Sequence, residues 1–544
     1  MDPGRIRMLD RSRPYKPLDI GNGLVAASVS PSGGIHSILT YDRDHGLVEL
    51  TAHPPFDDAL RYDQAAVRAY RATLAAPDAP AFGLRLAIDG EWRARVRADG
   101  APIGEIETGD VRVTVTTVAP GGMRGIAQQW QVTANRSCTL GCAWQLDPTL
   151  RRPSYPQLTE GGPLPAIDAL DQRGWHLLAI GPRAPDLRAT EMRLEAGTDV
   201  TFSTSFLFGS DAGEHRGTAT AREGSAVERA LGYARICAIR TEPDAFCILA
   251  DHRILPLSWN RDAYYVATLL RERGDRGLVS AHLRWLFRVA ERRDGVWGRS
   301  HLANGRVKDP AFQLDQQCYP LLEAAESGAA ATYASEIRET LAALERWRHG
   351  DLYTTAETPA DDPMPLPFHF SSHVLLWRTL RALSDAGFDV DAERVRRATL
   401  AAFVDQGRFA YATDGRGRHH HYHDANDLPT VLAPRWGFCM ADDPHWRATI
   451  AFAWSAENAA WYGGPLGGLG SVHTPHPWPL GDAQELIVAT AVGDATRRAR
   501  VIEKLRRVAT WDGLYPEAYD ERTGEVRSRH WFAWPAAVIA LEGA

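Results

Sequence analysis

Two sets of carboxylates in the C-terminal half of the chain could carry out acid and base catalysis. Asp361 and Asp362 are adjacent in a proline-stiffened loop, Thr-Pro-Ala-Asp-Asp-Pro-Met-Pro. Glu517 is the lone carboxylate of the aromatic segment Leu-Tyr-Pro-Glu-Ala-Tyr. A carboxyl group pushed into an apolar pocket has a raised pKa and can act as a general acid. Two separated carboxylates are the minimum apparatus for hydrolysing a glycosidic bond, although each could instead cap a helix or lie in a solvated turn.

Two upstream segments carry side chains that suit a sugar. Trp259, Arg261 and Asp262 lie in Leu-Ser-Trp-Asn-Arg-Asp-Ala-Tyr. Here the Arg and the Asp could grip vicinal hydroxyls while the indole covers a sugar face. The alternative is a helix cap by Asn260 or Asp262 beside a structural Arg. Asp315, in Ala-Phe-Gln-Leu-Asp-Gln-Gln-Cys-Tyr-Pro, either faces a ligand or caps a helix.

Two downstream segments add glycines and aromatic residues. Residues 463–475 contain five glycines, which let a backbone approach a ligand closely, and include His473 and Thr474. Trp531 and Trp534 follow and offer flat surfaces for a sugar, with interhelical packing as the alternative.

A histidine-rich segment, residues 419–427, reads His-His-His-Tyr-His-Asp-Ala-Asn-Asp and contains Asp424 and Asn426. A metal site is conceivable there, but three consecutive histidines cannot all face one ion. We therefore expect no metal and no cofactor.

The elements that position these residues change type near residue 240. From about residue 20 to 235, apolar residues recur at every second position, as in Val111 and Val113, which is typical of strands with one buried face. Asp89-Gly90, between two such runs, predicts a tight hairpin. Adjacent antiparallel strands of this kind favour a β-sandwich domain over residues 1–240.

The remaining residues, 241–544, show helical periodicity. Apolar residues such as Val279 and Leu283 are three or four positions apart, which indicates packed helices. Helix pairs over about 300 residues could form a solenoid, a bundle or a closed double-ring barrel. Because acidic and aromatic residues gather in the loops, a closed barrel with a loop-built pocket is favoured.

Composition excludes several classes of function. The chain has 544 residues, and 61 Lys and Arg against 68 Asp and Glu give a net charge of −7 with no basic block, so no nucleic-acid partner is expected. No stretch approaches the ~20 apolar residues that span a bilayer, and the start lacks an apolar signal region, so we expect no membrane partner and no signal peptide. Six scattered cysteines without a CxxC pair fit a cytoplasmic location. The oligomeric state stays open.

In their order along the chain, these segments resemble the motif series of the family 125 glycoside hydrolases, which are exo-acting α-mannosidases with an (α/α)6 barrel. The resemblance covers roughly residues 255–540. Residues 259–263 resemble the family's Trp-x-Arg-Asp-Ser, residues 313–320 its Glu-Leu-Asp-Ser with Cys-Tyr-Pro, and residues 358–362 its Arg-Pro-Ser-Asp-Asp. Residues 423–432 resemble Asp-Asp-Ala-Asn-x-Pro-Ser-Leu-Leu, and residues 468–475 resemble Gly-x-Gly-Ser-Pro-His-Thr-Pro. Residues 517–519 with 531–534 resemble Glu-Ser-Phe with Trp-Phe-Ala-Trp.

The resemblance implies a catalytic (α/α)6 barrel over residues 241–544 and an inverting hydrolase. Asp361 or Asp362 would be the general acid, with Asp361 preferred by analogy with related barrels, and Glu517 the general base. The terminal sugar would be held by Arg261, Asp262, His473 and Trp534. Further sugar-binding candidates from the matching motifs are Trp259, Asp315, Asp424, Asn426, Thr474 and Trp531.

Three departures from the family pattern bear on the sugar. The Arg of Arg-Pro-Ser-Asp-Asp is Thr358, the Ser after Arg-Asp is Ala263, and the first Asp of Asp-Asp-Ala-Asn is His423. A β-sandwich joined to such a barrel also resembles the wider clan of bacterial glucoamylases and glycosyl phosphorylases. An α-glucoside hydrolase, a phosphorylase and a non-catalytic carbohydrate-binding protein are therefore the alternatives, although a phosphorylase would not need Glu517.

Overall fold

The computed structural model describes residues 7–9, 12–60, 62–96, 101–145, 148–153, 175–180, 190–208 and 226–544. The chain divides into two compact units. The first unit consists of Met1–Thr241, Asp251–Pro256 and Thr510–Leu514, and the second of Glu242–Ala250, Leu257–Ala509 and Tyr515–Ala544. The units are therefore not simply consecutive in sequence, because two short segments that follow residue 250 belong to the first unit.

The described part of the first unit is mainly antiparallel sheet. The order of its largest sheet is β1 (Arg7–Met8), β7 (Arg93–Val96), β8 (Pro102–Glu107), β9 (Val111–Val118), β10 (Gly125–Ala134), β15 (Asp199–Phe208) and β13 (Trp175–Ile180). A second sheet has the order β12 (Thr149–Arg151), β5 (Gly46–Thr51), β4 (Ile35–Asp42), β3 (Val25–Val29) and β2 (Leu18–Gly21). A third contains β14 (Glu191–Leu194), β11 (Cys138–Gln145) and β6 (Gly83–Ala87). The helices α1 (Gln64–Leu74) and α3 (Ala226–Cys237) belong to the same unit.

The expected two-residue alternation of these strands is confirmed in β9. Val111, Val113 and Val115 are buried, whereas Arg112 between them is exposed. Side chains of the largest sheet share one core with the β6–β11–β14 sheet and another with the β2–β5 sheet. Burial of one face of β9 therefore accounts for its apolar pattern, whereas β3 is buried on both faces.

The tight hairpin expected at Asp89-Gly90 is wrong. β6 pairs with β11, whereas β7 pairs with β1 and β8, so the strands before and after Gly90 belong to different sheets. Leu86 of β6 is buried in one core and Ala94 of β7 in the other. Gly90, with φ of 142°, lies where the chain passes from one sheet to the next.

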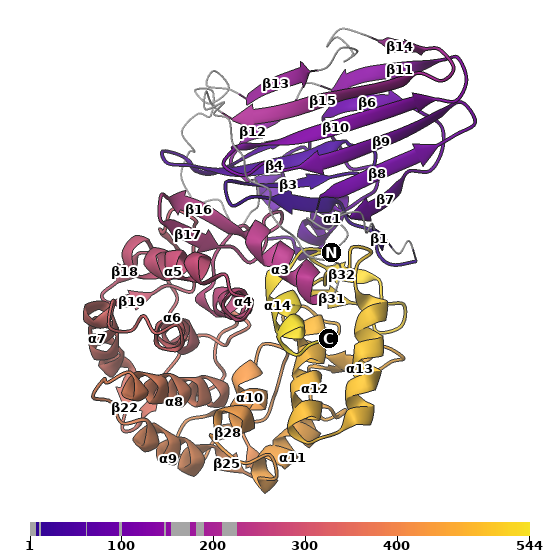
Figure 1. Ribbon diagram of the computed structural model, residues 1–544. Helices are drawn as coiled ribbons and strands as arrows, with labels where there is room; N and C mark the ends of the chain where they lie inside the picture. Colours follow the sequence, from indigo (N-terminus) through magenta and orange to yellow (C-terminus); the bar gives the residue numbers. More distant parts are fainter. Residues whose placement is uncertain are drawn as a thin grey trace. The chain divides into compact units, whose positions relative to one another are not determined.

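The second unit contains a closed ring of helices (Figure 1). Along the chain each inner helix packs against the next, and the last packs against the first. The inner helices are α4 (Asn260–Glu272), α6 (Leu314–Glu326), α8 (Phe370–Asp385), α10 (Leu428–Trp436), α12 (Pro479–Ala491) and α14 (Ala533–Leu541). The helices that alternate with them are α5 (Arg276–Arg284), α7 (Ala334–Leu344), α9 (Ala392–Phe403), α11 (Pro444–Ala453) and α13 (Ala495–Val508).

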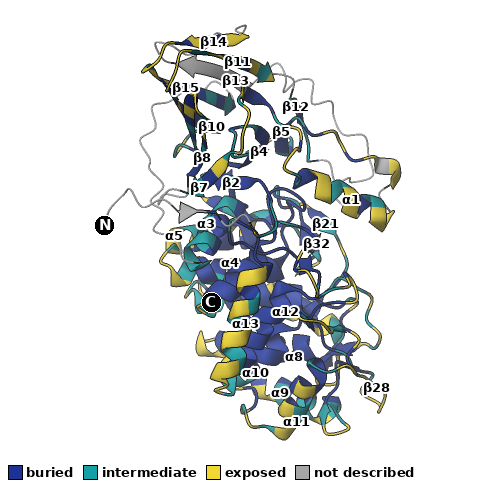
Figure 2. Cartoon of the chain, turned by 90° about the vertical axis from the view of Figure 1, so that its right-hand side faces the viewer, coloured by how far each residue is buried: buried dark blue, intermediate teal, exposed yellow. Residues whose placement is uncertain are grey.

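Burial distinguishes the two sets of helices, as Figure 2 shows for α12 and α13. Nearly every residue of α12 is buried, whereas in α13 only Val501, Leu505 and Val508 are. A single buried stripe is the pattern of a helix that covers the outside of a core. The helical spacing read from the sequence is confirmed in α5, where Val279 and Leu283 are buried.

In the parts of the chain listed above, no helix combines the length and the apolar character that crossing a bilayer requires. All six cysteines are free thiols, and only Cys138 is partly exposed. Short antiparallel hairpins and loops connect the helices of the second unit, and they carry the residues considered next.

Candidate active site

Each of the six motif segments leads into the N-terminus of an inner helix. The segments at 259–263, 313–320 and 358–362 precede or enter α4, α6 and α8. The segments at 423–432, 468–475 and 517–534 do the same for α10, α12 and α14. Hydrogen bonds and ion pairs join these loops pairwise, so that the loops meet at one end of the ring.

Asp361 is held by donors from two other loops. Trp259 Nε1 donates to Asp361 Oδ2 at 3.1 Å, and Gln313 Nε2 donates to Oδ1 at 2.8 Å. The backbone of Asp361 has φ of 65°, a left-handed conformation that Asp tolerates better than most residues and that is found often at functional sites. The side chain is still 23% exposed, so an oriented carboxyl group remains open to a ligand.

Arg261 connects the acidic residues of three segments. Its guanidinium lies 3.0 Å from Asp315, 3.5 Å from Asp262 and 3.6 Å from Asp361. Burial acts to lower the pKa of Arg261, but these three carboxylates outweigh it and raise the pKa. Burial also raises the pKa of Asp262 to about 7, against the charges of Arg261 and Arg529. Removing one partner would leave a buried charge uncompensated, so this network has to be complete.

Trp531 and Trp534 are packed in the interior and present no open face. Their exposed fractions are 0% and 1%. The guanidinium of Arg261 lies 5.2 Å from the ring centroid of Trp534, and Tyr265 stacks on the same indole at 5.9 Å. Of the two roles considered for these tryptophans, packing is the one that this burial favours, with Trp534 supporting Arg261.

Asp362 lies in the loop of residues 358–365, here called the aspartate loop, and His473 lies in the glycine-rich loop of residues 463–475. The two side chains join these loops. His473 Nδ1 lies 3.0 Å from Asp362 Oδ1, and the two side chains are 46% and 39% exposed. This hydrogen bond raises the pKa of His473 against the effect of burial, and the charges of Asp362, Glu517 and Asp361 add to the rise. His473 is therefore near both carboxylate loops and can donate to a ligand, whereas Thr474 is only 9% exposed.

Glu517 lies at the base of the hairpin formed by β31 (Ala518–Tyr519) and β32 (Val526–Ser528) and is 7% exposed. Ser528 Oγ donates to Glu517 Oε2 at 2.5 Å, and Arg529 Nη1 donates to Oε1 at 3.2 Å. Tyr519 anchors the hairpin by donating to Asp482 of α12 at 2.8 Å. The orientation of the Glu517 carboxylate is thus fixed from both sides.

The acidic residues of the first three segments do not cap the helices that follow them. The helix-cap alternative is therefore wrong for α4, α6 and α8. The N-caps of α4, α6 and α8 are Trp259, Gln313 and His369, of which only His369 accepts a hydrogen bond through its side chain. Asp361 and Asp362 lie in the sequence well before α8, which begins at Phe370. The carboxylates are therefore available for contacts among the loops.

Asp424 and Asn426 are buried side chains of the loop that precedes α10. Ser471 Oγ donates to Asp424 Oδ2 at 3.0 Å, and the backbone N–H of Asn426 donates to Asp424 Oδ1 at 2.8 Å. Burial raises the pKa values of Asp424 and Asp427, and Asp427 Oδ1 lies 3.2 Å from His369 Nε2. Asp424 therefore joins its own loop to the glycine-rich loop, whereas the bond of Asn426 lies within its own loop.

Three polar residues of the site were not expected from the sequence. Gln313 bridges Asp361 and Arg261, accepting from Arg261 Nη1 at 3.4 Å. Arg299 donates to both oxygens of Glu357 at 3.1 Å, and Arg529 contacts Glu517. Gln313 could have been found, because it stands two residues before Asp315 in a motif. For Arg299 and Arg529, no spacing in the sequence predicts which carboxylate each arginine binds.

The histidines of residues 419–423 do not converge on one point. The ring nitrogens of His419, His421 and His423 have as partners, in that order, the carbonyl oxygen of Ala402, the carboxylate of Asp405 and the amide of Gln484. His419 Nδ1 also lies 3.8 Å from Asp405, so His419 and His421 share that carboxylate, whereas His423 has a separate contact.

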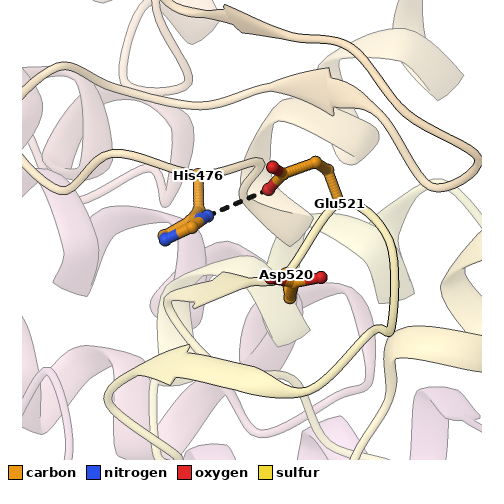
Figure 3. A group of neighbouring side chains, drawn as sticks. All are labelled: His476, Asp520 and Glu521. Atoms are coloured by element: carbon orange, nitrogen blue, oxygen red, sulfur yellow. Dashed lines mark hydrogen bonds and ion pairs between the residues drawn. The ribbon is translucent and has the colours of Figure 1, made fainter.

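Among the described residues, His476, Asp520 and Glu521 have the spacing of metal ligands, with ligand atoms within 4.8 Å of one another (Figure 3). His476 Nδ1 is 3.0 Å from Glu521 Oε2. The Asp520 carboxylate already accepts bonds from the Arg527 guanidinium and from two backbone N–H groups of its own turn. The group therefore ties the glycine-rich loop to the Glu517 hairpin.

Comparison with known proteins shows which families the chain is similar to. Residues 354–541 match the sequence model of the metal-independent α-mannosidases of glycoside hydrolase family 125. A bacterial glucoamylase complexed with acarbose has a similar fold, with a TM-score of 0.61 and 12% identity over 99% of this chain and 97% of that chain. A metal-independent α-mannosidase of Streptococcus pneumoniae, in complex with α-1,6-mannobiose, has a TM-score of 0.45 and 20% identity over 58% of this chain and 92% of that chain. No curated protein matches the chain.

The region matched by the family model contains the aspartate loop, the glycine-rich loop and the Glu517 hairpin. It thus includes Asp361, Asp362, His473 and Glu517, whose contacts are described above. We conclude that the chain is a glycoside hydrolase, in which residues 354–541 are similar to the metal-independent α-mannosidases of family 125.

Proposed function

We propose that the protein is an exo-acting, inverting glycoside hydrolase that removes a terminal α-linked sugar, with an α-mannoside as the favoured substrate. The observation that carries this proposal is the environment of His473. This exposed ring bonds Asp362, which raises the pKa of His473, and the charges of Glu517 and Asp361 add to the rise. Two carboxylate loops that face one exposed imidazole are suited to a sugar bound between an acid and a base.

In the proposed reaction, the acid donates its proton to the glycosidic oxygen as the bond from the anomeric carbon to that oxygen breaks. Glu517 accepts a proton from water while the water oxygen attacks the anomeric carbon on the opposite face. The direct displacement inverts the anomer and needs no covalent intermediate. His473 contacts the terminal sugar, whereas Arg261 and Trp534, which are buried, hold the acid loop.

We assign the acid to Asp361. Its two oxygens accept hydrogen bonds from Trp259 and Gln313, which fix the orientation of the carboxyl group. Arg261 at 3.6 Å is already paired with Asp315 at 3.0 Å, so its charge is shared. Asp362 instead holds His473.

The finer architecture is part of the proposal. We take the helical unit to be an (α/α)6 barrel domain within residues 241–544, from which Asp251–Pro256 and Thr510–Leu514 are excluded, and residues 1–240 to be an antiparallel β-sandwich domain. The closed ring of inner helices and the two cores shared between sheets support this assignment. A cytoplasmic location stays a prediction from the cysteine pattern.

An α-glucoside is the second candidate substrate, because the guanidinium of the family's Arg-Pro-Ser-Asp-Asp is missing. Thr358, which stands in its place, uses its hydroxyl within its own loop, where it accepts from the N–H groups of Ala360 and Asp362 at 3.1 and 3.3 Å. A sugar contact that depends on that Arg is therefore absent at this position. Phosphorolysis is disfavoured, since phosphate would make the oriented Glu517 redundant.

We expect the first-formed sugar product to have the inverted anomeric configuration. The measurement is a screen of nitrophenyl α-glycosides and short α-linked disaccharides, followed by proton nuclear magnetic resonance in the first minutes of turnover on the best substrate. Hydrolysis of mannosides over glucosides supports the favoured substrate. A retained anomer would require an enzyme nucleophile and would refute the proposed mechanism, and turnover only with added phosphate would indicate a phosphorylase.

We expect chelator treatment to leave the rate of hydrolysis unchanged. The proposed steps use two carboxylates and water, and the candidate ligands at His476 and Asp520 are engaged in other bonds. The assay compares rates before and after prolonged dialysis against a strong chelator. Loss of activity that one specific divalent ion restores would contradict this expectation.

A further inference from the structure

Arg529 has contacts that the proposed reaction does not yet use. Its guanidinium donates to Glu517 Oε1 at 3.2 Å, and the two side chains are 5% and 9% exposed. The backbone N–H of Glu517 donates to the carbonyl oxygens of Ser528 and Arg529, at 3.2 and 2.9 Å. The base and the arginine are thus joined through both main chain and side chain.

The position of Arg529 is fixed by its own backbone and by packing. Its φ of 39° is left-handed, an uncommon conformation for a residue of this size, and its guanidinium lies 4.1 Å from the ring centroid of Phe532. A planar, permanently charged fork held in this way can fix both the direction and the charge of a carboxylate.

Arg529 also connects the base to the acid loop. Its charge acts on Asp262, where it opposes the rise in pKa that burial causes. Asp262 in turn lies 3.5 Å from Arg261, whose guanidinium lies 3.6 Å from Asp361. Alternating positive and negative groups therefore run from Glu517 to the proposed acid.

We propose that Arg529 is a positioning residue, which holds the Glu517 carboxylate ionised and oriented as a general base through their buried ion pair. This inference rests on the proposed function, because it assigns the base role to Glu517. A buried carboxylate that loses its cation takes up a proton more readily, and a protonated Glu517 cannot accept a proton from water.

Arg529→Met and Arg529→Lys test this role on the full chain, with Arg527→Met as a matched control. Arg527 lies on the same hairpin, but it binds Asp520. In Arg529→Met we expect kcat to fall by about 10²-fold with KM changed by less than about threefold, because a misplaced base slows the chemical step. The acidic limb of kcat/KM should move up by about one pH unit, since an opposite charge no longer favours the carboxylate. Arg529→Lys should return the acidic limb of kcat/KM to its wild-type pH but should restore only part of kcat. Arg527→Met should have the kcat and the pH profile of the wild type.

Several results would overturn the inference. One is a wild-type kcat with an unmoved acidic limb in Arg529→Met. Another is a rise in KM in Arg529→Met while kcat and the acidic limb of the pH profile stay unchanged, which would make Arg529 a sugar ligand. If Arg529→Met does not fold, Arg529→Lys decides, because a wild-type kcat in that variant shows that the planar guanidinium does not orient the base. Absence of hydrolysis by the wild type would refute the proposed function itself, whereas wild-type turnover with a neutral Arg529 variant would refute this inference alone.

Discussion

Glu517→Gln is expected to leave the fold intact and to lower kcat by on the order of 10³-fold or more. Water would lose the group that accepts its proton, while the side chains that contact the sugar would stay in place. The defect should therefore appear in kcat far more than in KM. Steady-state rates on the best substrate of the screen measure it.

The hairpin can accept the amide without rebuilding. Arg529 can continue to donate to the remaining carbonyl oxygen, and the Ser528 hydroxyl, 2.5 Å from Glu517 Oε2, can rotate to accept from the new N–H. Circular dichroism and the melting temperature should confirm that the variant is folded. A large loss of kcat in a folded protein then isolates the chemical role of the carboxylate.

Glu525→Gln is the matched control, because Glu525 is an exposed carboxylate of the same hairpin region. It should retain the wild-type rate. Near-normal turnover in Glu517→Gln would remove this residue from the mechanism and direct attention to Glu521 or to a phosphate-dependent reaction.

The loops of the candidate site could be predicted from the sequence because their signals are local. The helical stripe of Val279 and Leu283 reports which face of a helix is buried, and the acidic and aromatic loops between stripes indicate where a ligand binds. In the structure every one of those loops leads into an inner helix. Alternating helix pairs that close into a ring bring such loops together without any further signal in the sequence.

The environment of each side chain could not be predicted, because it depends on tertiary contacts. Trp534 has the type of a sugar platform, but Arg261 and Tyr265 cover it. The pairing of Arg529 with Glu517 depends on a hairpin register and a left-handed φ that no motif encodes. In the same way Asp89-Gly90 has the composition of a hairpin turn, although the strands that flank it bury their apolar faces in different cores.

Asp361→Asn is expected to impair substrates according to their leaving groups. For a natural disaccharide, whose leaving oxygen must be protonated, kcat/KM should fall by about 10²–10⁴-fold. For an activated aryl glycoside the loss should be less than about tenfold, since that leaving group departs as an anion. Asn also tolerates the left-handed φ of 65° at this position, so the backbone of the loop can remain as it is.

Asp362→Asn should affect both substrates by a similar factor, because the acid is still present. Asn at this position weakens the bond to His473 and removes the charge that raises the pKa of that ring, so the sugar is held less firmly. This loss should appear mainly in KM. The two variants therefore differ in which kinetic constant changes and in their dependence on the leaving group.

The experiment measures both variants on a nitrophenyl glycoside and on the matching disaccharide, together with their melting temperatures. A defect selective for the disaccharide in Asp362→Asn alone would exchange the two roles. The same defect in neither variant would contradict an acid in this loop and leave Asp315 and Asp424 as the carboxyls to test. Asp315 is paired with Arg261 at 3.0 Å and Asp424 is 2% exposed, so either one would have to become accessible when substrate binds.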